Sequence, residues 1–181
     1  PKVTRLVFPV TVVTGADCRE IKASSPQASS GVYVVQPVRG EASFKVYCEM
    51  RPDGGWTVFQ RRSGASVAFN RNWAAYKNGF GDLTQDHWLG LRKVFSLTKN
   101  KTRKWILRVD LWDHEGGNAF AEYKNFRLGN EETGFKLHVG KFKGNAGNVM
   151  VGAPGHCITT SCHCPIETKP RKPTHGKGPI T

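Results

Sequence analysis

Aromatic side chains stop well before the end of this 181-residue chain, and that break limits what the chain can fold into. All five tryptophans lie before residue 113, and residues 148–181 hold five prolines and three cysteines but no aromatic residue. Large aromatic side chains dominate hydrophobic cores, so we expect the core to come from the residues before 148. Residues 149–181 show no strand or helix period, which predicts a divergent, disordered basic tail. Residues 1–15 are expected to be a lead-in segment.

The net charge of +13, from 27 basic and 14 acidic residues, favours polyanionic partners such as heparan-type glycans. The basic residues are spread along the chain in small clusters, which is typical of a solvated surface. We therefore rank a basic surface above a dedicated polyanion site, and we expect no nucleic-acid partner. No apolar stretch approaches the ~20 residues that span a bilayer, so no membrane insertion is expected.

Alternating and helical patterns predict an α+β fold. A short helix or turn starts at residues 17–21 and ends at the Ser24–Pro26 cluster. Two further helices are expected, one over residues 89–98 and one capped at its N-terminus by Asn70 and stopped by Gly79. Strand patterns fall at 32–36, 44–50, 56–61, 105–112, 119–128 and 135–142, with turn residues between them. The chain thus has strands first, then two helices, then further strands. This order predicts an antiparallel sheet with short flanking helices.

The clearest strand is 105–112, because its apolar residues recur at every second position. Trp105, Leu107, Val109 and Leu111 are expected to face a core, and Ile106, Arg108, Asp110 and Trp112 to face the other way.

Cysteines are few and unevenly placed. Cys18 and Cys48 stand alone in the first 150 residues, while Cys157, Cys162 and Cys164 crowd the tail, and an odd total leaves at least one thiol unpaired. The tail also brings His156 and His163 beside these thiols. Structural zinc sites use Cys-x-x-Cys pairs separated by a loop, and this spacing differs, so no metal site is predicted.

Several motifs, in one order along residues 16–148, resemble the fibrinogen C-terminal domain family. Within that family they are most similar to the angiopoietin-like and fibrinogen-like secreted proteins. They are Asp17-Cys18, Ser30–Tyr33, Phe44–Met50, Asp53–Arg62, Phe69–Asp82, His87–Leu91, Leu107–Leu111, Phe120–Tyr123 and Gly144–Gly147. So many motifs in sequence make the resemblance specific.

This resemblance implies a fibrinogen C-terminal-like domain over residues 16–148, with Cys18 and Cys48 joined as its first disulfide. It implies a secreted, extracellular protein, because disulfides persist in oxidising compartments. It also implies a non-catalytic recognition module whose partner is a protein receptor or an acetylated or acidic glycan. Oligomers in this family form through upstream segments.

The chain departs from the family after Gly147. An aspartate-rich calcium loop, a second disulfide and a tryptophan-rich ligand pocket are expected there, but Asn148 is followed by no aspartate, and Glu167 is the only acidic residue of the tail. Calcium takes six to eight oxygen ligands. We therefore expect no calcium, no other cofactor, and no family-type ligand-pocket subdomain. Edge strands left exposed would favour aggregation or pairing with another chain; a non-functional truncated variant is the alternative.

Asn100-Lys101-Thr102 is an N-glycosylation sequon in a polar loop between the second long helix and strand 105–112. Modification of Asn100 and an unmodified basic loop remain open alternatives. The same loop supplies the best candidate polyanion site, formed by Lys99, Lys101, Arg103 and Lys104.

Asp110, Asp113, His114 and Glu115 raise the question of acid–base chemistry. They lie beside no nucleophile, phosphate loop or metal pair, so no catalytic residue is assigned. Three hypotheses follow: an extracellular recognition module that is not an enzyme, a non-specific polyanion binder, and a hydrolase using residues 110–115. The first is preferred.

Overall fold

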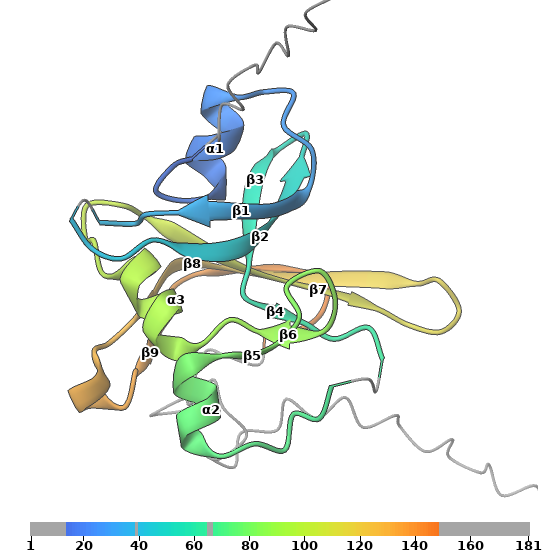
Figure 1. Cartoon of the computed structure of the whole chain (residues 1–181). Helices are drawn as coiled ribbons and strands as arrows, with labels where there is room; N and C mark the ends of the chain where they lie inside the picture. The colour runs from blue at the N-terminus through green and yellow to red at the C-terminus, as the bar shows by residue number, and fades with distance from the viewer. Residues whose placement is uncertain (1–13, 39, 65–66, 149–181) are drawn as a thin grey trace, which may run out of the picture.

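The computed structural model describes residues 14–38, 40–64 and 67–148, so the lead-in and tail expected from the sequence lie almost wholly outside the described residues. Within them, no helix combines the length and apolarity needed to cross a membrane. Three small antiparallel sheets and three short α-helices make up this part of the chain, which confirms the α+β prediction (Figure 1).

The first sheet has the order β1-β2-β3, with β1 at Gly31–Val35, β2 at Phe44–Arg51 and β3 at Gly54–Val58. Helix α1 (Cys18–Ser24) packs on β3, and the Asp17 carboxylate caps it by accepting the Glu20 N–H at 2.9 Å. Only glycine fits at position 55, because a Cβ there would lie 2.0 Å from the Cys18 carbonyl oxygen. Helix and sheet therefore approach at backbone contact.

The second sheet has the order β4-β6-β5, with β4 at Gln60–Arg61, β5 at Phe80–Gly81 and β6 at His87–Trp88. Helix α2 (Trp73–Asn78) precedes β5, and α3 (Leu91–Thr98) follows β6. The expectation that Asn70 caps the first of these helices is wrong. Asn72 is the cap, and its Oδ1 accepts the Ala75 N–H at 2.9 Å.

The third sheet carries the long β7–β8 hairpin, whose far end extends beyond the rest of the domain in Figure 1. Its order is β10-β8-β7, and β9 pairs separately with β8. The elements are β7 (Trp105–Trp112), β8 (Asn118–Leu128), the 3₁₀ helix η1 (Glu131–Thr133), β9 (Leu137–His138) and β10 (Phe142–Gly144).

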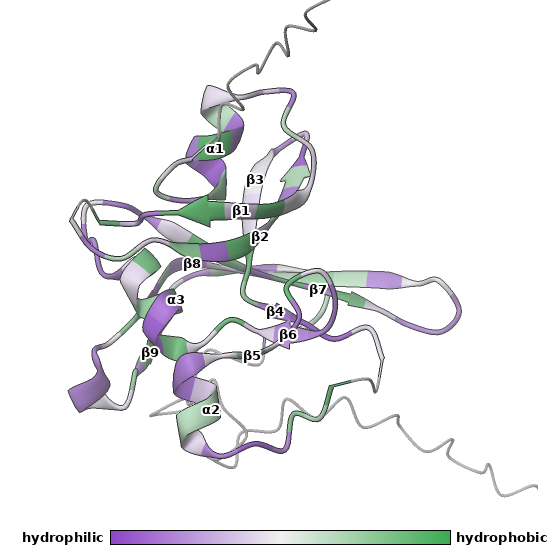
Figure 2. Cartoon of the chain, in the orientation of Figure 1, coloured by the Kyte–Doolittle hydropathy of each residue, from purple (hydrophilic) through white to green (hydrophobic). Residues whose placement is uncertain are grey.

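One hydrophobic core joins the sheets. Phe59, between β3 and β4, packs against Trp88 and Phe126 with ring centroids 5.7 and 6.0 Å apart. Tyr123 of β8 is fully buried. Figure 2 shows the apolar colour along β1, while the exposed turns are hydrophilic.

Three local expectations change. The strand expected at 56–61 is interrupted at Phe59, whose carbonyl accepts the Leu89 N–H at 2.8 Å. The strand expected at 135–142 is two short strands, β9 and β10. Leu111 was expected to face the core, but its side chain is 41% exposed and that of Trp112 is 73% exposed, because the end of β7 packs on nothing in the described core.

Candidate functional site

The structure joins Cys18 to Cys48, which tethers α1 to the central strand of the first sheet. The two Cα atoms lie 5.4 Å apart, within the usual disulfide range, and both side chains are fully buried. The bridge closes a segment of 30 residues that contains β1 and most of β2. Cys157, Cys162 and Cys164 lie outside the described residues.

The basic loop does not form a continuous cationic surface. Lys99 pairs with Glu41, and its hydrogen bond to that carboxylate lowers the pKa of Glu41. Arg103 pairs with Asp17 at 2.5 Å. Lys101 and Lys104 are exposed and make no ion pair within the described part of the chain. Two of the four cations in the predicted polyanion site are thus already neutralised.

Asn100 lies exposed in the turn that follows α3. Its Oδ1 accepts hydrogen bonds from the Thr102 N–H at 3.0 Å and the Thr102 hydroxyl at 2.8 Å. The sequon therefore forms a compact, exposed turn.

Asp110 and Asp113, two of the carboxylates at 110–115, have structural roles. Asp110 accepts from Arg108 and Arg51, and Asp113 accepts the Glu115 and Gly117 N–H groups at 3.0 and 2.7 Å. They therefore stabilise the strand and its turn. No group of three or more histidine, cysteine or acidic side chains that could hold a metal occurs among the described residues.

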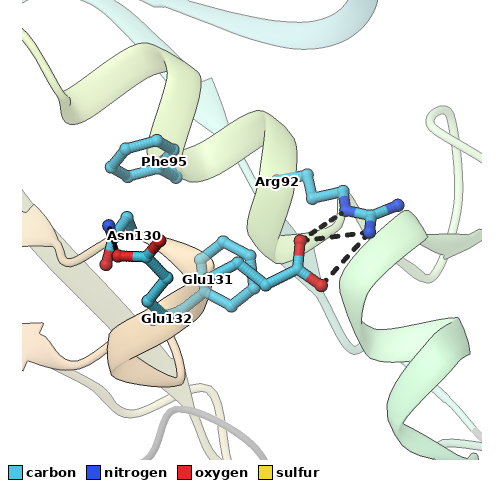
Figure 3. A pocket seen from close by; sticks show the side chains of 6 residues that line it. Arg92, Phe95, Asn130, Glu131 and Glu132 are labelled. Carbon is cyan, nitrogen blue, oxygen red and sulfur yellow. Dashed lines mark hydrogen bonds and ion pairs between the residues drawn. The ribbon is translucent and has the colours of Figure 1, made fainter.

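A groove of about 410 Å³ between α3 and η1 is the feature that sequence reasoning missed. Phe95 supplies its accessible apolar surface, with the Phe135 ring almost fully buried beside it, and Figure 3 shows the Arg92 side chain of α3 meeting the Glu131 carboxylate. Polar residues of both elements complete the lining, namely Arg92, Asn130, Glu131 and Glu132. The pair of glutamates in a strongly basic chain was the only sequence signal for it.

Local structure places Phe135 in this groove. Asn130 caps η1, and Gly134 ends it in the left-handed conformation. Phe135 itself has a φ of 56°, a conformation that costs free energy for a bulky residue and persists only where packing over-determines it. Its ring is 3% exposed and lies 6.3 Å from the rings of both Trp73 and Phe95.

Glu131 and Glu132 differ in their ion pairs and hydrogen bonds. Glu131 accepts from Arg92 Nη2 at 3.0 Å and from Lys77 Nζ at 2.7 Å, and the Lys77 hydrogen bond, followed by that of Arg92, lowers the pKa of Glu131. It remains ionised and ties η1 to α2 and α3. Glu132 is exposed, and its carboxylate accepts only from Asn130 Nδ2 within the described residues. The groove therefore offers an apolar surface beside one carboxylate available to a cation.

Comparison with known proteins identifies the family. The sequence model described as "Fibrinogen beta and gamma chains, C-terminal globular domain" matches residues 14–165. Human fibrinogen-like protein 1 is 42% identical over 140 residues, which cover 76% of this chain and 44% of that protein. Human fibrinogen C domain-containing protein 1 is 46% identical over 142 residues, covering 75% of this chain and 30% of the relative. The chain thus spans less than half the length of these relatives.

Solved structures agree. The fibrinogen-like globe domain of human ANGPTL2 superposes with a TM-score of 0.69 at 40% identity, over 74% of this chain and 61% of that one. A lamprey fibrin D-dimer, solved with the peptide ligand Gly-His-Arg-Pro-amide, gives a TM-score of 0.72 at 35% identity over 78% of this chain and 44% of that one. Sequence and fold agree that this chain belongs to the fibrinogen C-terminal globular domain family.

Proposed function

We propose that this chain acts as a secreted, non-catalytic recognition module that binds a protein partner through the α3–η1 groove. The observation that carries the proposal is a fibrinogen-like fold with a buried disulfide joining α1 to β2. A structural disulfide persists in an oxidising compartment, which supports an extracellular location. The family inference also favours binding over catalysis.

The chemistry of the groove favours a protein segment over a glycan. The accessible surface of Phe95 beside the free carboxylate of Glu132 suits an apolar side chain that neighbours a lysine or arginine. Acidic glycans would be repelled by the same carboxylate. The proposal therefore does not include the acetylated or acidic glycan expected from the family resemblance, and it includes no calcium or other cofactor.

A heparan-type polyanion binder is the second candidate, supported by the net charge of +13 and by the exposed Lys101 and Lys104. It requires an affinity that falls steeply with salt and shows no protein specificity. A glycan on Asn100, detectable as a mass loss after enzymatic deglycosylation, would partly cover the same loop.

Binding of the fluorescently labelled, secreted chain to a panel of cultured cells tests the proposal. Glu132→Lys reverses the free charge without touching the Arg92–Glu131–Lys77 bridges, and we expect about a tenfold or greater loss of binding. Asn70→Lys is the control, because Asn70 is exposed and lies outside the groove. Loss of binding after heparinase, with Glu132→Lys as active as the parent chain, would instead establish the polyanion binder.

A further inference from the structure

His87 of β6 is a buried histidine, and both of its ring nitrogens lie at hydrogen-bond distance from a backbone carbonyl. The residue is only 1% exposed. Its Nδ1 lies 2.9 Å from the Gln85 carbonyl oxygen, and its Nε2 lies 3.2 Å from the Val58 carbonyl oxygen. A carbonyl oxygen can only accept a hydrogen bond, so each contact requires an N–H on the imidazole. A ring with two N–H groups carries a positive charge.

Neither neutral tautomer of His87 fits this position. A neutral imidazole has one N–H, and its other nitrogen presents a lone pair. That lone pair would face a carbonyl oxygen at hydrogen-bond distance, so one hydrogen bond would be replaced by repulsion. Burial by itself favours the neutral ring. Against it stand two hydrogen bonds from a charged donor, each about twice as strong as one between neutral groups.

The two hydrogen bonds connect His87 to different parts of the fold. Gln85 belongs to the turn that leads into β6, so the Nδ1 contact is local. Val58 is the last residue of β3 and lies 29 positions before His87, so the Nε2 contact joins the second sheet to the first. Beside it, the Leu89 N–H donates to the Phe59 carbonyl at 2.8 Å. The charged ring therefore supplies part of the link between β3 and β6.

Close packing holds the ring in place. Gly81 of β5 is paired with His87 in the β5–β6 ladder, and a Cβ at position 81 would lie 2.7 Å from the His87 Cα. Trp88, the next residue of β6, is 2% exposed. Neither Gly81 nor Val58 brings a charge to the ring. A neutral His87 could reach water only if the strands around it separated.

Two carboxylates lie near His87 and favour its positive charge. Asp86 directly precedes it, and hydrogen bonds from Ser63 and Gly64 keep that buried carboxylate ionised. Asp82 lies in the turn before β6. The Thr84 hydroxyl is the main cause that lowers the pKa of Asp82, and the charge of His87 lowers it further.

The cations on the neighbouring strand are directed elsewhere. Arg61 is paired with His87 in the β4–β6 ladder, and Arg62 follows it in the chain. Each guanidinium group lies over an aromatic ring, 4.2 and 4.4 Å from the ring centroid. Arg61 also donates to the Thr84 carbonyl at 3.2 Å. Their charges are therefore held by partners other than the His87 ring.

We propose that His87 is a pH-dependent link between β3 and β6, which joins the two sheets as a cation and releases the Val58 carbonyl when it loses its proton. The proton goes to solvent. The remaining N–H stays on Nδ1, because the contact with Gln85 is the shorter of the two. This property lies beyond the proposed groove function, since His87 does not line the α3–η1 groove.

The direction of the pH effect follows from proton binding. In the unfolded chain a histidine loses its proton near pH 6.5, whereas the fold holds the His87 proton to higher pH. Over that interval the folded state binds more protons than the unfolded state. The stabilisation is thus fully present below about pH 6.5 and is lost as the pH rises. A chain that moves from an acidic compartment to neutral surroundings would loosen between β3 and β6.

NMR of the ¹⁵N-labelled full chain between pH 5 and 9 tests the protonation directly. At pH 6.5 we expect both His87 ring nitrogens to have imidazolium shifts and to keep them to higher pH than those of His114. His114 is exposed in the β7–β8 turn and serves as the internal reference. The spectrum of His87→Gln assigns the signals. A His87 ring that is neutral at pH 6 overturns the proposal.

Urea unfolding at pH 5.5 and 8.5 tests the link. Between these values the unfolding equilibrium constant of the parent chain should rise about tenfold or more relative to that of His87→Gln, because each pH unit over which the fold retains one extra proton contributes a factor of ten. His114→Gln is the matched control and should behave like the parent chain.

The comparison also removes the contribution of His138. Burial is the main cause that lowers the pKa of His138, so its effect on stability has the opposite sign and is shared by all three proteins. Equal pH dependence of the parent chain and His87→Gln would overturn the proposal. If His87→Gln does not fold, the His87 signals of the parent chain, assigned through their correlation to the His87 backbone, decide the question alone.

Discussion

Asp86 is a carboxylate that is only 1% exposed and is held ionised by hydrogen bonds rather than by an ion pair. It accepts from the Ser63 N–H at 2.6 Å, the Ser63 hydroxyl at 2.7 Å and the Gly64 N–H at 3.2 Å. The Ser63 backbone hydrogen bond is the largest of the effects that lower the pKa of Asp86, and it outweighs the opposing effect of burial. The residue fastens the loop after β4 to β6.

Replacing Asp86 should therefore destabilise the fold in a pH-dependent way. Asp86→Asn puts an amide donor against N–H donors, and we expect a loss of about 2 kcal/mol at pH 7. Because the folded pKa is lowered, the stabilisation is fully present above the ordinary aspartate pKa of about 3.9 and is lost as the pH falls through the folded value. Urea unfolding of both proteins between pH 2 and 7 should show the gap narrowing below about pH 4.

Asp53→Asn is the matched control, since Asp53 is 51% exposed in a surface pair with Arg51, and such pairs contribute about 1 kcal/mol or less. A gap for Asp86→Asn that stays constant down to pH 2 would contradict the assigned role. The sequence alone could not have singled out Asp86, because its partners lie 22 and 23 residues away and are brought to it only by the β4–β6 pairing.

At the scale of elements, two asparagines before α2 could each have capped the helix by sequence, but only one does. The Asn72 Oδ1 accepts the Ala75 N–H, whereas the exposed Asn70 lies outside the helix and its cap. Asn72→Ala should cost about 1 kcal/mol of unfolding free energy, and Asn70→Ala should cost almost nothing. Chemical denaturation of the two variants beside the parent chain measures both. Equal losses would mean that α2 begins earlier than the structure places it.

Long periodic elements could be predicted from sequence and short ones could not. The alternation at 105–112 predicted β7 with its observed bounds, because one face of the strand is buried against the core over much of its length. The pattern at 135–142 was misread because the pairing with β8 is irregular at Gly140, between β9 and β10. Its N–H donates to the Lys124 carbonyl at 2.6 Å, while the Lys124 N–H bonds to Lys141. Alternating apolar residues carry no signal for such an interruption.

At the scale of the whole molecule, sequence predicted the fold and family but not the α3–η1 groove. The α3–η1 groove needs Phe95 and Phe135, 40 residues apart, to meet, and it depends on a left-handed backbone at Phe135 that its residue type disfavours. Such surfaces arise from tertiary placement, so periodicity and motifs do not encode them locally.

The Cys18–Cys48 bridge acts on the stability of the whole domain. It closes a segment of 30 residues, and in the chain-entropy model such a loop constrains the unfolded state by about 3–4 kcal/mol. Replacing both cysteines by serine should lower the unfolding free energy by about that amount, measured by urea denaturation, and should reduce the secreted yield. Replacing Cys157, Cys162 and Cys164 by serine is the control, since the core of the described domain contains none of them. If the control variant loses as much stability as the first, the tail thiols take part in the fold and the loss in the first variant does not measure the Cys18–Cys48 bridge alone.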